Sequence, residues 1–200
     1  MKITAIRAQV KNPERLSLYV DEKYAFSLTY AQLLDEKLHA GLELSEDRLA
    51  SLKHASDFGK AYERALNYVM IRPRSVKELR DYARRKQWMP EDTQIIVDKL
   101  CARRYLDDRN FARAWVENRA IGKKTSQRKL RLELKQKGVA DDIIADVLAA
   151  NMYDENDALK QLIAKKRRLA RFAADEQKLM QYLARQGFGF DDIKSALQDS

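Results

Sequence analysis

The chain has 200 residues, of which 45% are apolar and 34% charged, and its formal net charge is +9. This size allows one or two domains with a hydrophobic core. The positive charge favours an anionic partner such as nucleic acid, an acidic protein surface or an anionic membrane, although the solvated faces of a helical protein give the same composition. A single cysteine excludes an intrachain disulfide, and because no apolar run approaches the roughly 20 residues of a membrane span, we expect a soluble cytoplasmic protein.

Residues 1–56 have no net charge and show the pattern of strands. In "RLSLYV" apolar residues alternate with others and place Leu16, Leu18 and Val20 on one face. The polar "DEK" that follows predicts a turn, and "YAFSL" predicts the partner strand. A third strand from "ITAIRAQV" or a covering helix is expected, since a lone hairpin is marginal. A helix then begins in "GLELSEDRLASL", with Ser45 as its N-cap.

From residue 57 onward a helical pattern recurs about every 50 residues. The runs "SVKELRDYARRKQW", "SQRKLRLELKQKGV" and "DEQKLMQYLARQGF" each begin with a helix-capping residue, at Ser75, Ser126 and Asp175. Each run carries two apolar residues four positions apart, which lie on one helix face. The spacing of Ser75 and Glu78 further predicts a capping box at the start of the first run.

The ends of these runs also recur. The second and third copies close with glycine followed by an apolar residue, at Gly138 and Gly187, a pattern typical of a helix C-terminus in which glycine takes the left-handed conformation. The first copy has Gln87–Trp88 instead. The glycine is therefore predicted to be part of the helix–helix turn in copies two and three.

Each copy is flanked by two further helical runs. A helix with acids in its first turn follows ("PEDTQIIVDKL", "ADDIIADVL", "FDDIKSAL"), and another precedes ("AYERALNYVM", "NFARAWVENRAI", "ALKQLIAKKRRLARFA"). Because a unit of about 50 residues buries little surface alone, neighbouring units should stack. The sequence predicts a mainly α chain, with three tandem three-helix repeats in an elongated curved array after a small N-terminal strand segment with a helix. The predicted domains are 1–56, 57–106, 107–152 and 153–200.

The stretch "YLDDRNFARAWV" marks the junction between the first two repeats. Its adjacent Asp107 and Asp108 have the chemistry of a metal or acid–base pair, but they also suit the start of a helix. The same device recurs in "MYDENDAL" at the next junction, and this favours capping by Asp107 or Asp108. Phe111 and Trp115 are predicted to anchor the new helix in the core, and Gly138 to close the helix after it.

Residue patterns typical of catalysis are absent from the sequence. It contains no P-loop, no GxGxxG, no CxxC and no HExxH, and His39 and His54 have no metal-ligand spacing around them. Cys101 lies in an apolar run and is predicted to be a core residue rather than a nucleophile. We therefore expect no catalytic, metal or cofactor site, no small-molecule substrate, and no enzyme.

The run "YLDDRNFARAWVENR", the turn Gly122–Lys123–Lys124 and the run "RKLRLELKQKGV" together resemble the RecX family of recombinase regulators, and "PRSVKELRDYARRK" resembles that family's first repeat. The resemblance implies three tandem three-helix repeats. It also implies binding to the RecA recombinase in its filament on single-stranded DNA, and restraint of ATP hydrolysis, strand exchange and co-protease activity. The implied partners are the RecA filament and, weakly or through the filament, single-stranded DNA, with no membrane.

Clusters of basic side chains near the loop between the first and second helices of each repeat are the candidate contacts for RecA or DNA, although solvated faces are the plain alternative. If the repeats stack, these loops form a long positive stripe. The alternative function is a direct DNA-binding helical protein, similar to a helix-turn-helix factor in transcription or repair, with residues 126–137 as the reading helix. The candidates are Arg72, Arg74, Lys77, Arg80, Arg84, Arg85 and Lys86; Arg119, Lys123, Lys124, Arg128, Lys129 and Arg131; and Lys165, Lys166, Arg167, Arg168 and Arg171.

Overall fold

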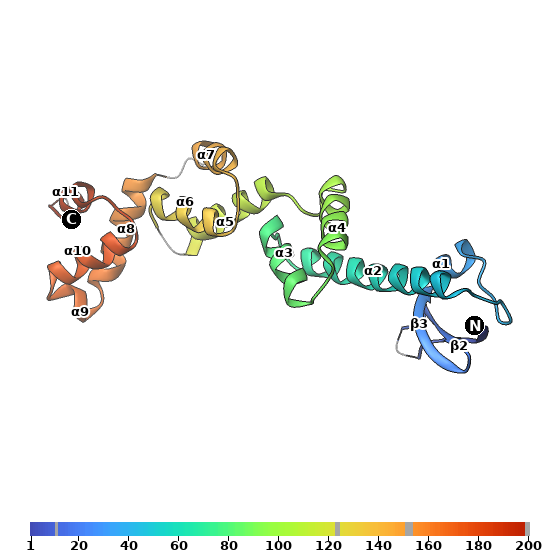
Figure 1. Ribbon diagram of the computed structural model, residues 1–200. Helices are drawn as coiled ribbons and strands as arrows, with labels where there is room; N and C mark the ends of the chain where they lie inside the picture. Colours follow the sequence, from blue (N-terminus) through green and yellow to red (C-terminus); the bar gives the residue numbers. More distant parts are fainter. Residues whose placement is uncertain (11, 123–124, 151–153, 199–200) are drawn as a thin grey trace. The chain divides into compact units, whose positions relative to one another are not determined.

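The computed structural model describes all residues except 11, 123–124, 151–153 and 199–200 (Figure 1). The chain divides into two compact units, Met1–Asn67 and Tyr68–Ser200. The expected mainly α chain with an N-terminal strand segment is confirmed. Among the helices within the described residues, none has the length and apolar character needed to cross a membrane.

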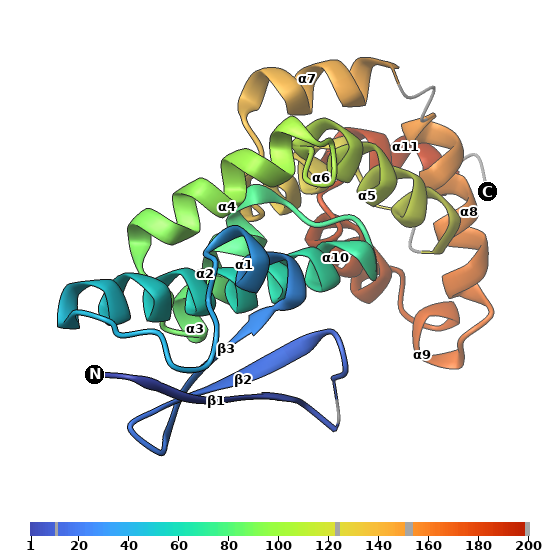
Figure 2. The ribbon, with the colours of Figure 1, turned by 90° about the vertical axis from the view of Figure 1, so that its right-hand side faces the viewer.

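The first unit contains a three-stranded antiparallel sheet in the order β1-β2-β3, formed by Ile3–Ala8, Arg15–Val20 and Lys23–Thr29. All three predicted strands are therefore present. The turn between β2 and β3 has positive φ angles at Asp21 (46°) and Glu22 (67°), as tight hairpin turns require. Figure 2 shows the sheet with α1 (Tyr30–Asp35) and α2 (Glu46–Met70) on one side of it.

The core of the first unit lies between the sheet and these helices. Leu18 and Phe26 from the sheet and Leu52 from α2 are fully buried together. Ser45 caps α2 as predicted, since its hydroxyl accepts a hydrogen bond of 3.2 Å from the backbone N–H of Arg48. Helix α1, which the sequence did not predict, has a complete capping box between Thr29 and Gln32.

Arg15 connects the sheet to α2 in the first unit. Its side chain is buried, forms two hydrogen bonds of 3.1 Å to the carboxylate of Glu63, and donates to the hydroxyl and carbonyl oxygens of Ser27. A buried guanidinium is tolerated only where its donors are satisfied, so this contact fixes where α2 lies against the sheet.

Helix α2 is longer than the sequence suggested. It runs for 25 residues without a break, through the point between residues 56 and 57 where the run "SEDRLASL" was expected to give way to a separate helix. The sequence contains neither proline nor a glycine pair in this stretch to interrupt the hydrogen-bond ladder.

In the second unit the helices follow one another in the predicted three-helix groups, coloured from green to red in Figure 1. Repeat 1 consists of the end of α2 with α3 and α4, repeat 2 of α5 to α7, and repeat 3 of α8 to α11. The bounds are α3 Val76–Arg85, α4 Pro90–Ala102, α5 Asp108–Gly122, α6 Gln127–Gln136, α7 Asp141–Ala150, α8 Glu155–Arg167, α9 Ala170–Ala173, α10 Glu176–Arg185 and α11 Phe190–Gln198.

Each of the last two repeats has its own apolar core. In repeat 2, Phe111 and Val116 of α5 pack with Leu130 and Leu134 of α6 and with Ile144 of α7. Repeat 3 has a corresponding cluster of α8, α10 and α11. Repeat 3 differs from the prediction in one respect: the run before α10 that was expected to be one helix is broken. Helix α8 ends at Arg167, and the short α9 follows.

The second helix of each repeat ends in the same way. Gly138 and Gly187 have φ angles of 77° and 93°, and Gln87 takes the same left-handed conformation with φ 55°. In the first two repeats the following residue bonds back to the helix, since the N–H groups of Trp88 and Val139 donate to the carbonyl oxygens of Ala83 and Leu134 at 3.1 Å. The predicted turn is therefore formed in all three repeats, with or without glycine.

Candidate functional site: two equivalent joints and a cationic pocket

Repeats 1 and 2 are joined where the N-terminus of α3 meets the C-terminus of α6. The hydroxyl of Ser75 accepts a hydrogen bond from the N–H of Glu78 in its own helix and donates one of 2.8 Å to the carbonyl oxygen of Lys137. Next to it, the ammonium of Lys77 donates to the carbonyl oxygen of Gln136 at 2.7 Å. The end carbonyls of one helix are therefore satisfied by the start of another.

The aspartate pair also takes part in this joint, and the two residues have different roles. Asp107 caps its own helix, because its carboxylate accepts from the N–H groups of Arg109 and Asn110 at 2.8 and 3.0 Å. Asp108 instead accepts a 2.9 Å hydrogen bond from the N–H of Val76, the first residue of α3. The prediction of capping rather than chemistry fits this geometry, and Asp108 caps a helix of the neighbouring repeat.

Repeats 2 and 3 are joined in the same way. The hydroxyl of Ser126 accepts from the N–H of Lys129 and donates to the carbonyl oxygen of Gln186 at 3.1 Å. The N–H of Gln127, the first residue of α6, forms a hydrogen bond with Glu155 at the start of α8. The serine contact and the contact of an acidic residue with the first N–H of the helix thus occur in both joints, at the aligned positions of the repeats.

The glycines that end α6 and α10 are needed because the joints are close-packed. A Cβ atom at Gly138 would lie 2.7 Å from the Cβ of Lys77. At Gly187 it would meet the hydroxyl of Ser126. Gln87 ends α3, and its side chain is exposed. Glycine is therefore present at the two ends on which another helix rests, and this explains why the first repeat tolerates glutamine.

Three carboxyl groups at the joints have perturbed pKa values. Burial raises the pKa of Asp108 against the opposing effect of the Val76 N–H, and burial raises that of Glu155 against the effect of the Gln127 N–H. Burial by itself would also raise the pKa of Glu78. Hydrogen bonds and positive charge from Arg72 and Lys137 outweigh it, so that the pKa of Glu78 lies below its ordinary value.

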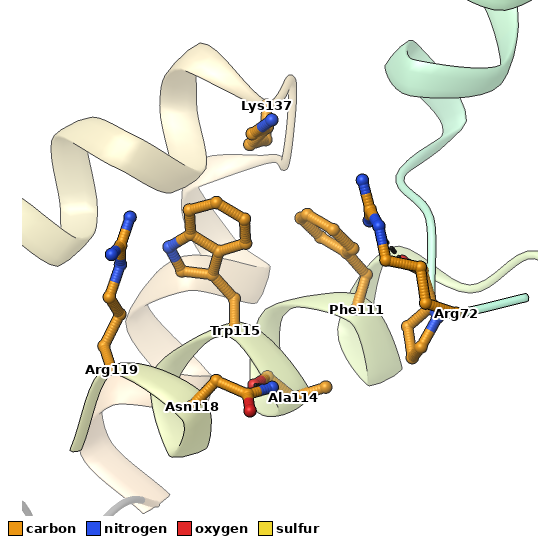
Figure 3. Close-up of a pocket in the computed structure, with 8 residues that line it drawn as sticks. Arg72, Phe111, Ala114, Trp115, Asn118, Arg119 and Lys137 are labelled. Carbon is orange, nitrogen blue, oxygen red and sulfur yellow. Dashed lines mark hydrogen bonds between the residues drawn. The ribbon is translucent and has the colours of Figure 1, made fainter. Parts of the chain in front are cut away.

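A pocket of about 440 Å³ opens beside the first joint (Figure 3). One wall is the indole of Trp115, which stands between Arg119 and Phe111 in Figure 3. Arg119 and Lys137 lie 5.0 and 5.2 Å from the centroid of the Trp115 ring. Arg72, Pro73, Ala114 and Asn118 complete the lining.

Two glutamates hold the cations of this pocket in place. Glu133 accepts hydrogen bonds of 2.9 Å from both the indole N–H of Trp115 and Nε of Arg119. Glu78 accepts from Arg72 and from Lys137. Three cations thus face two carboxylates, which leaves the pocket with a positive balance and with side chains in fixed positions.

The predicted basic residues fall into three classes: those bonded within the fold, those with surface contacts only, and those without a partner among the described residues. Several are engaged within the fold: besides Arg72, Arg119 and Lys77, Arg74 lies over the ring of Tyr68, and Lys129 bonds to Gln186. Others form only surface contacts, such as Arg80 with Gln94 and Arg84 with Asp81. Lys123 and Lys124 lie outside the described residues.

The remaining basic candidates occur at the surface of each repeat. Lys166 lies over the ring of Tyr182, and Arg167 donates to the carbonyl oxygen of Leu197. A final group has exposed side chains with no polar or ring partner among the described residues. It consists of Arg85 in repeat 1, Arg128 and Arg131 in repeat 2, and Lys165 and Arg168 in repeat 3.

Three details of the sequence interpretation were wrong. Cys101 is exposed rather than part of the core, and its pKa is raised by partial burial and by the neighbouring aspartates, so it is not an activated thiol. The capping box at Ser75 is half formed, since the carboxylate of Glu78 turns to Arg72 and Lys137 instead. The run "ALKQLIAKKRRLARFA", expected as one helix, is divided between α8 and the short α9.

Sequence reasoning also missed the joints. Ser126, Gly187 and Lys137 were not singled out as partners of other repeats, and Glu133 was not singled out as the partner of Trp115 and Arg119. The available signal was the pairing of a serine in one copy with a glycine in the next, Ser75 with Gly138 and Ser126 with Gly187. Within the described residues, no group of three or more His, Cys, Asp or Glu side chains could hold a metal ion.

Comparison with known proteins gives the same division into parts. Sequence models match the RecX N-terminal domain at residues 1–45 and the first, second and third RecX three-helix domains at residues 61–100, 107–148 and 153–197. A crystal structure of a regulatory protein RecX is similar over 97% of this chain and 98% of its own, with a TM-score of 0.73 and 28% identity. The structure of RecX from Lactobacillus salivarius is similar over 72% of this chain and 97% of its own, with a TM-score of 0.61 and 27% identity.

Among curated sequences, the regulatory protein RecX of Bacillus velezensis is 37% identical over 99% of this chain and 77% of its own length. The regulatory protein RecX of Bacillus subtilis is 32% identical over 98% of this chain and 75% of its own. The agreement covers the strand segment and all three repeats. The chain belongs to the RecX family of regulatory proteins.

Proposed function

We propose that this chain binds the filament that the RecA recombinase forms on single-stranded DNA and restrains it, slowing ATP hydrolysis, strand exchange and stimulated repressor cleavage. The chain acts in the cytoplasm without catalysis of its own. Its functional divisions are those expected from the sequence, 1–56, 57–106, 107–152 and 153–200. Family membership supports this role, because the resemblance to RecX implies it.

One observation carries the proposal. Each repeat exposes cationic side chains without a polar or ring partner among the described residues, for example Arg85 in repeat 1, Arg128 in repeat 2 and Arg168 in repeat 3. A filament presents the same acidic and phosphate surfaces many times. Three weak contacts on one chain then bind far more tightly than one, because the second and third form at a high effective concentration.

The test is the ATPase activity of RecA on single-stranded DNA. Added at well below one molecule per RecA subunit, the protein should slow hydrolysis, because one chain restrains several subunits. Unchanged hydrolysis at equimolar protein contradicts the proposal. Pull-down with RecA in the presence and absence of single-stranded DNA then separates binding to the filament from binding to free RecA.

A charge reversal locates the contact. The double change Arg128→Glu and Arg131→Glu, or the set Lys123→Glu, Lys124→Glu and Arg128→Glu, should raise the concentration needed for half inhibition by about tenfold. A control matched to the double change is Lys23→Glu with Lys53→Glu, which changes the net charge equally on exposed residues of the first unit. An equal loss in the control means that total charge, not this surface, sets the affinity.

The alternative, a helix-turn-helix factor with α6 as the reading helix, has weaker support. The exposed side of α6 offers Arg128, Arg131 and Leu132 to a groove. The third helices α4, α7 and α11 each begin with two acids, which phosphates repel. Binding to duplex DNA with strong sequence preference at high salt would favour this alternative over the filament.

A further inference from the structure

The pocket beside Trp115 combines an open space with an aromatic and cationic wall, and the joints between repeats need neither. A helix–helix joint requires satisfied carbonyls and close packing, which Ser75 and Gly138 provide. The space of about 440 Å³ next to it remains open, bounded by a half-buried indole and by arginine and lysine side chains. Spaces of this size in proteins hold small ligands or single residues of a larger one.

We infer that this pocket is a subsite for one nucleotide of a DNA single strand, with its phosphate on Arg119 and Lys137 and its base against Trp115. The inference rests on the proposed function, in which the chain works at a filament formed on single-stranded DNA. It adds the place where this chain touches the strand itself.

The donors of the pocket are available and oriented. Glu133 engages only Nε of Arg119, so the two terminal amino groups of that guanidinium have no hydrogen-bond partner among the described residues and remain for a ligand. Lys137 gives one hydrogen bond to Glu78 and retains two N–H groups. Because both cations lie close to the Trp115 ring, a phosphate that binds them brings its own base within reach of the indole.

An acidic peptide is the other anionic ligand to weigh. A carboxylate satisfies one or two cations, but it has no flat apolar group to cover Trp115 and Pro73, and it fills little of the space. A nucleotide supplies both the anion and an aromatic ring. Base stacking on aromatic side chains together with cationic backbone contacts is the usual way in which proteins hold single strands.

Trp115 can report on its own pocket. The chain has two tryptophans, and the change Trp88→Phe leaves Trp115 as the only one. Full-length Trp88→Phe protein, without RecA, is titrated with oligothymidylate labelled with fluorescein. The anisotropy of the label reports binding anywhere on the chain, and the emission of Trp115 reports stacking in the pocket. We expect quenching of Trp115 that follows the anisotropy curve.

Two variants test the assignment in different ways. Arg119→Gln removes a phosphate contact, so affinity should fall roughly tenfold and the log–log salt slope should shrink by about 0.7. Ala114→Leu fills part of the pocket without changing charge and should weaken binding as well. Arg64→Gln, an exposed arginine of the first unit that is not among the candidate binding residues, is the matched control and should change affinity less than about twofold. Circular dichroism melts check that each variant is folded.

Several outcomes would overturn the inference: no oligonucleotide binding, binding without a change in Trp115 emission, or unaltered affinity in folded Ala114→Leu. An equal loss in Arg64→Gln would also overturn it, since it would point to diffuse attraction. If polyglutamate quenches Trp115 while oligothymidylate does not, the pocket takes an acidic peptide instead. None of these results affects the RecA ATPase assay, so the proposed function stands or falls separately.

Discussion

The hydroxyl of Ser75 donates a hydrogen bond of 2.8 Å to the carbonyl oxygen of Lys137, across 62 residues of sequence. The acceptor is a backbone atom, so this hydrogen bond does not depend on which side chain stands at that position. The second joint has glutamine there, at Gln186. The repeats are thus connected through a feature that every helix has, its unsatisfied C-terminal carbonyls.

Loss of a joint serine should cost more than loss of an ordinary cap. Ser126→Ala removes both the cap on the Lys129 N–H and the donor to Gln186, and should lower the free energy of unfolding by about 2–3 kcal/mol. Asp175→Ala, at the aligned position of repeat 3, removes a cap and an exposed ion pair with Lys178 but no contact with another repeat, and should cost less. Urea unfolding followed by circular dichroism measures both. Equal costs would show that the contact between repeats contributes nothing.

A methyl group at Gly138 should disrupt the first joint. In Gly138→Ala the new Cβ meets the Lys77 side chain at 2.7 Å and the residue must keep a φ of 77°, so we expect a loss of about 1–3 kcal/mol in the free energy of unfolding. Gln87→Ala is the matched control, since Gln87 already has a side chain at the same helix-end position. Urea midpoints of the two variants should differ, and a coincidence of the two would contradict the close packing described for the joint.

The joint should also respond to pH through Asp108. Its pKa is raised in the folded protein, mainly by burial, so the folded state binds a proton more readily than the unfolded state does. Stability from this group therefore increases as the pH falls toward the ordinary value of the carboxyl pKa, and it is reduced above the raised pKa. In Asp108→Asn the acceptor for the Val76 N–H is retained and this dependence disappears.

The expected result is a difference between two pH profiles. Thermal or urea unfolding of wild type and Asp108→Asn from about pH 7 to pH 4 should show the wild type gaining stability relative to the variant as the pH falls. The comparison removes the contribution of Glu78 to the pH dependence. Its lowered pKa makes stability fall with falling pH, and it does so equally in both proteins. A relative loss of wild-type stability toward low pH would show that Asp108 is an ordinary paired carboxylate.

In the first unit, the hydrogen bonds of the buried Arg15, which include those to the half-exposed Glu63, should matter much more than an exposed ion pair. Arg15→Met removes four hydrogen bonds from a side chain that is 6% exposed, leaves Glu63 unpaired, and should cost about 3 kcal/mol. Arg48→Met removes the exposed ion pair with Glu36 and should cost less than about 1 kcal/mol. Chemical denaturation measures both, and similar values would mean that Arg15 does not tie α2 to the sheet.

Much of the fold could be predicted because its signals are local. Alternation in "RLSLYV", apolar spacing in the repeats and the glycine at two of the three helix ends depend on residues within a few positions of one another. Helix α1 was missed because it has only six residues and none of them is buried, so it carries no periodic pattern. The continuation of α2 was missed because nothing in a neutral, polar stretch marks where one helix continues into another.

The candidate site was harder to predict for a physical reason. A basic residue looks the same in sequence whether it faces water or a partner within the fold, and Lys77 and Arg128 show the two cases. What distinguishes them is a carbonyl or carboxylate supplied by a distant repeat. Trp115 was predicted as a core anchor from its spacing, but the cations around it come from three separate segments of the chain.

Each joint has two sides, a helix that starts with serine and a helix that ends with glycine, and the three repeats contribute different sides. Repeat 1 contributes a serine start and repeat 3 a glycine end. Repeat 2 contributes both, since Gly138 contacts the repeat before it and Ser126 the repeat after it. A unit with two complementary ends is one that gene duplication can multiply. Copying the segment that encodes repeat 2 would lengthen the protein by a module whose joints are already made, whereas a copy of repeat 1 or repeat 3 would lack one of them.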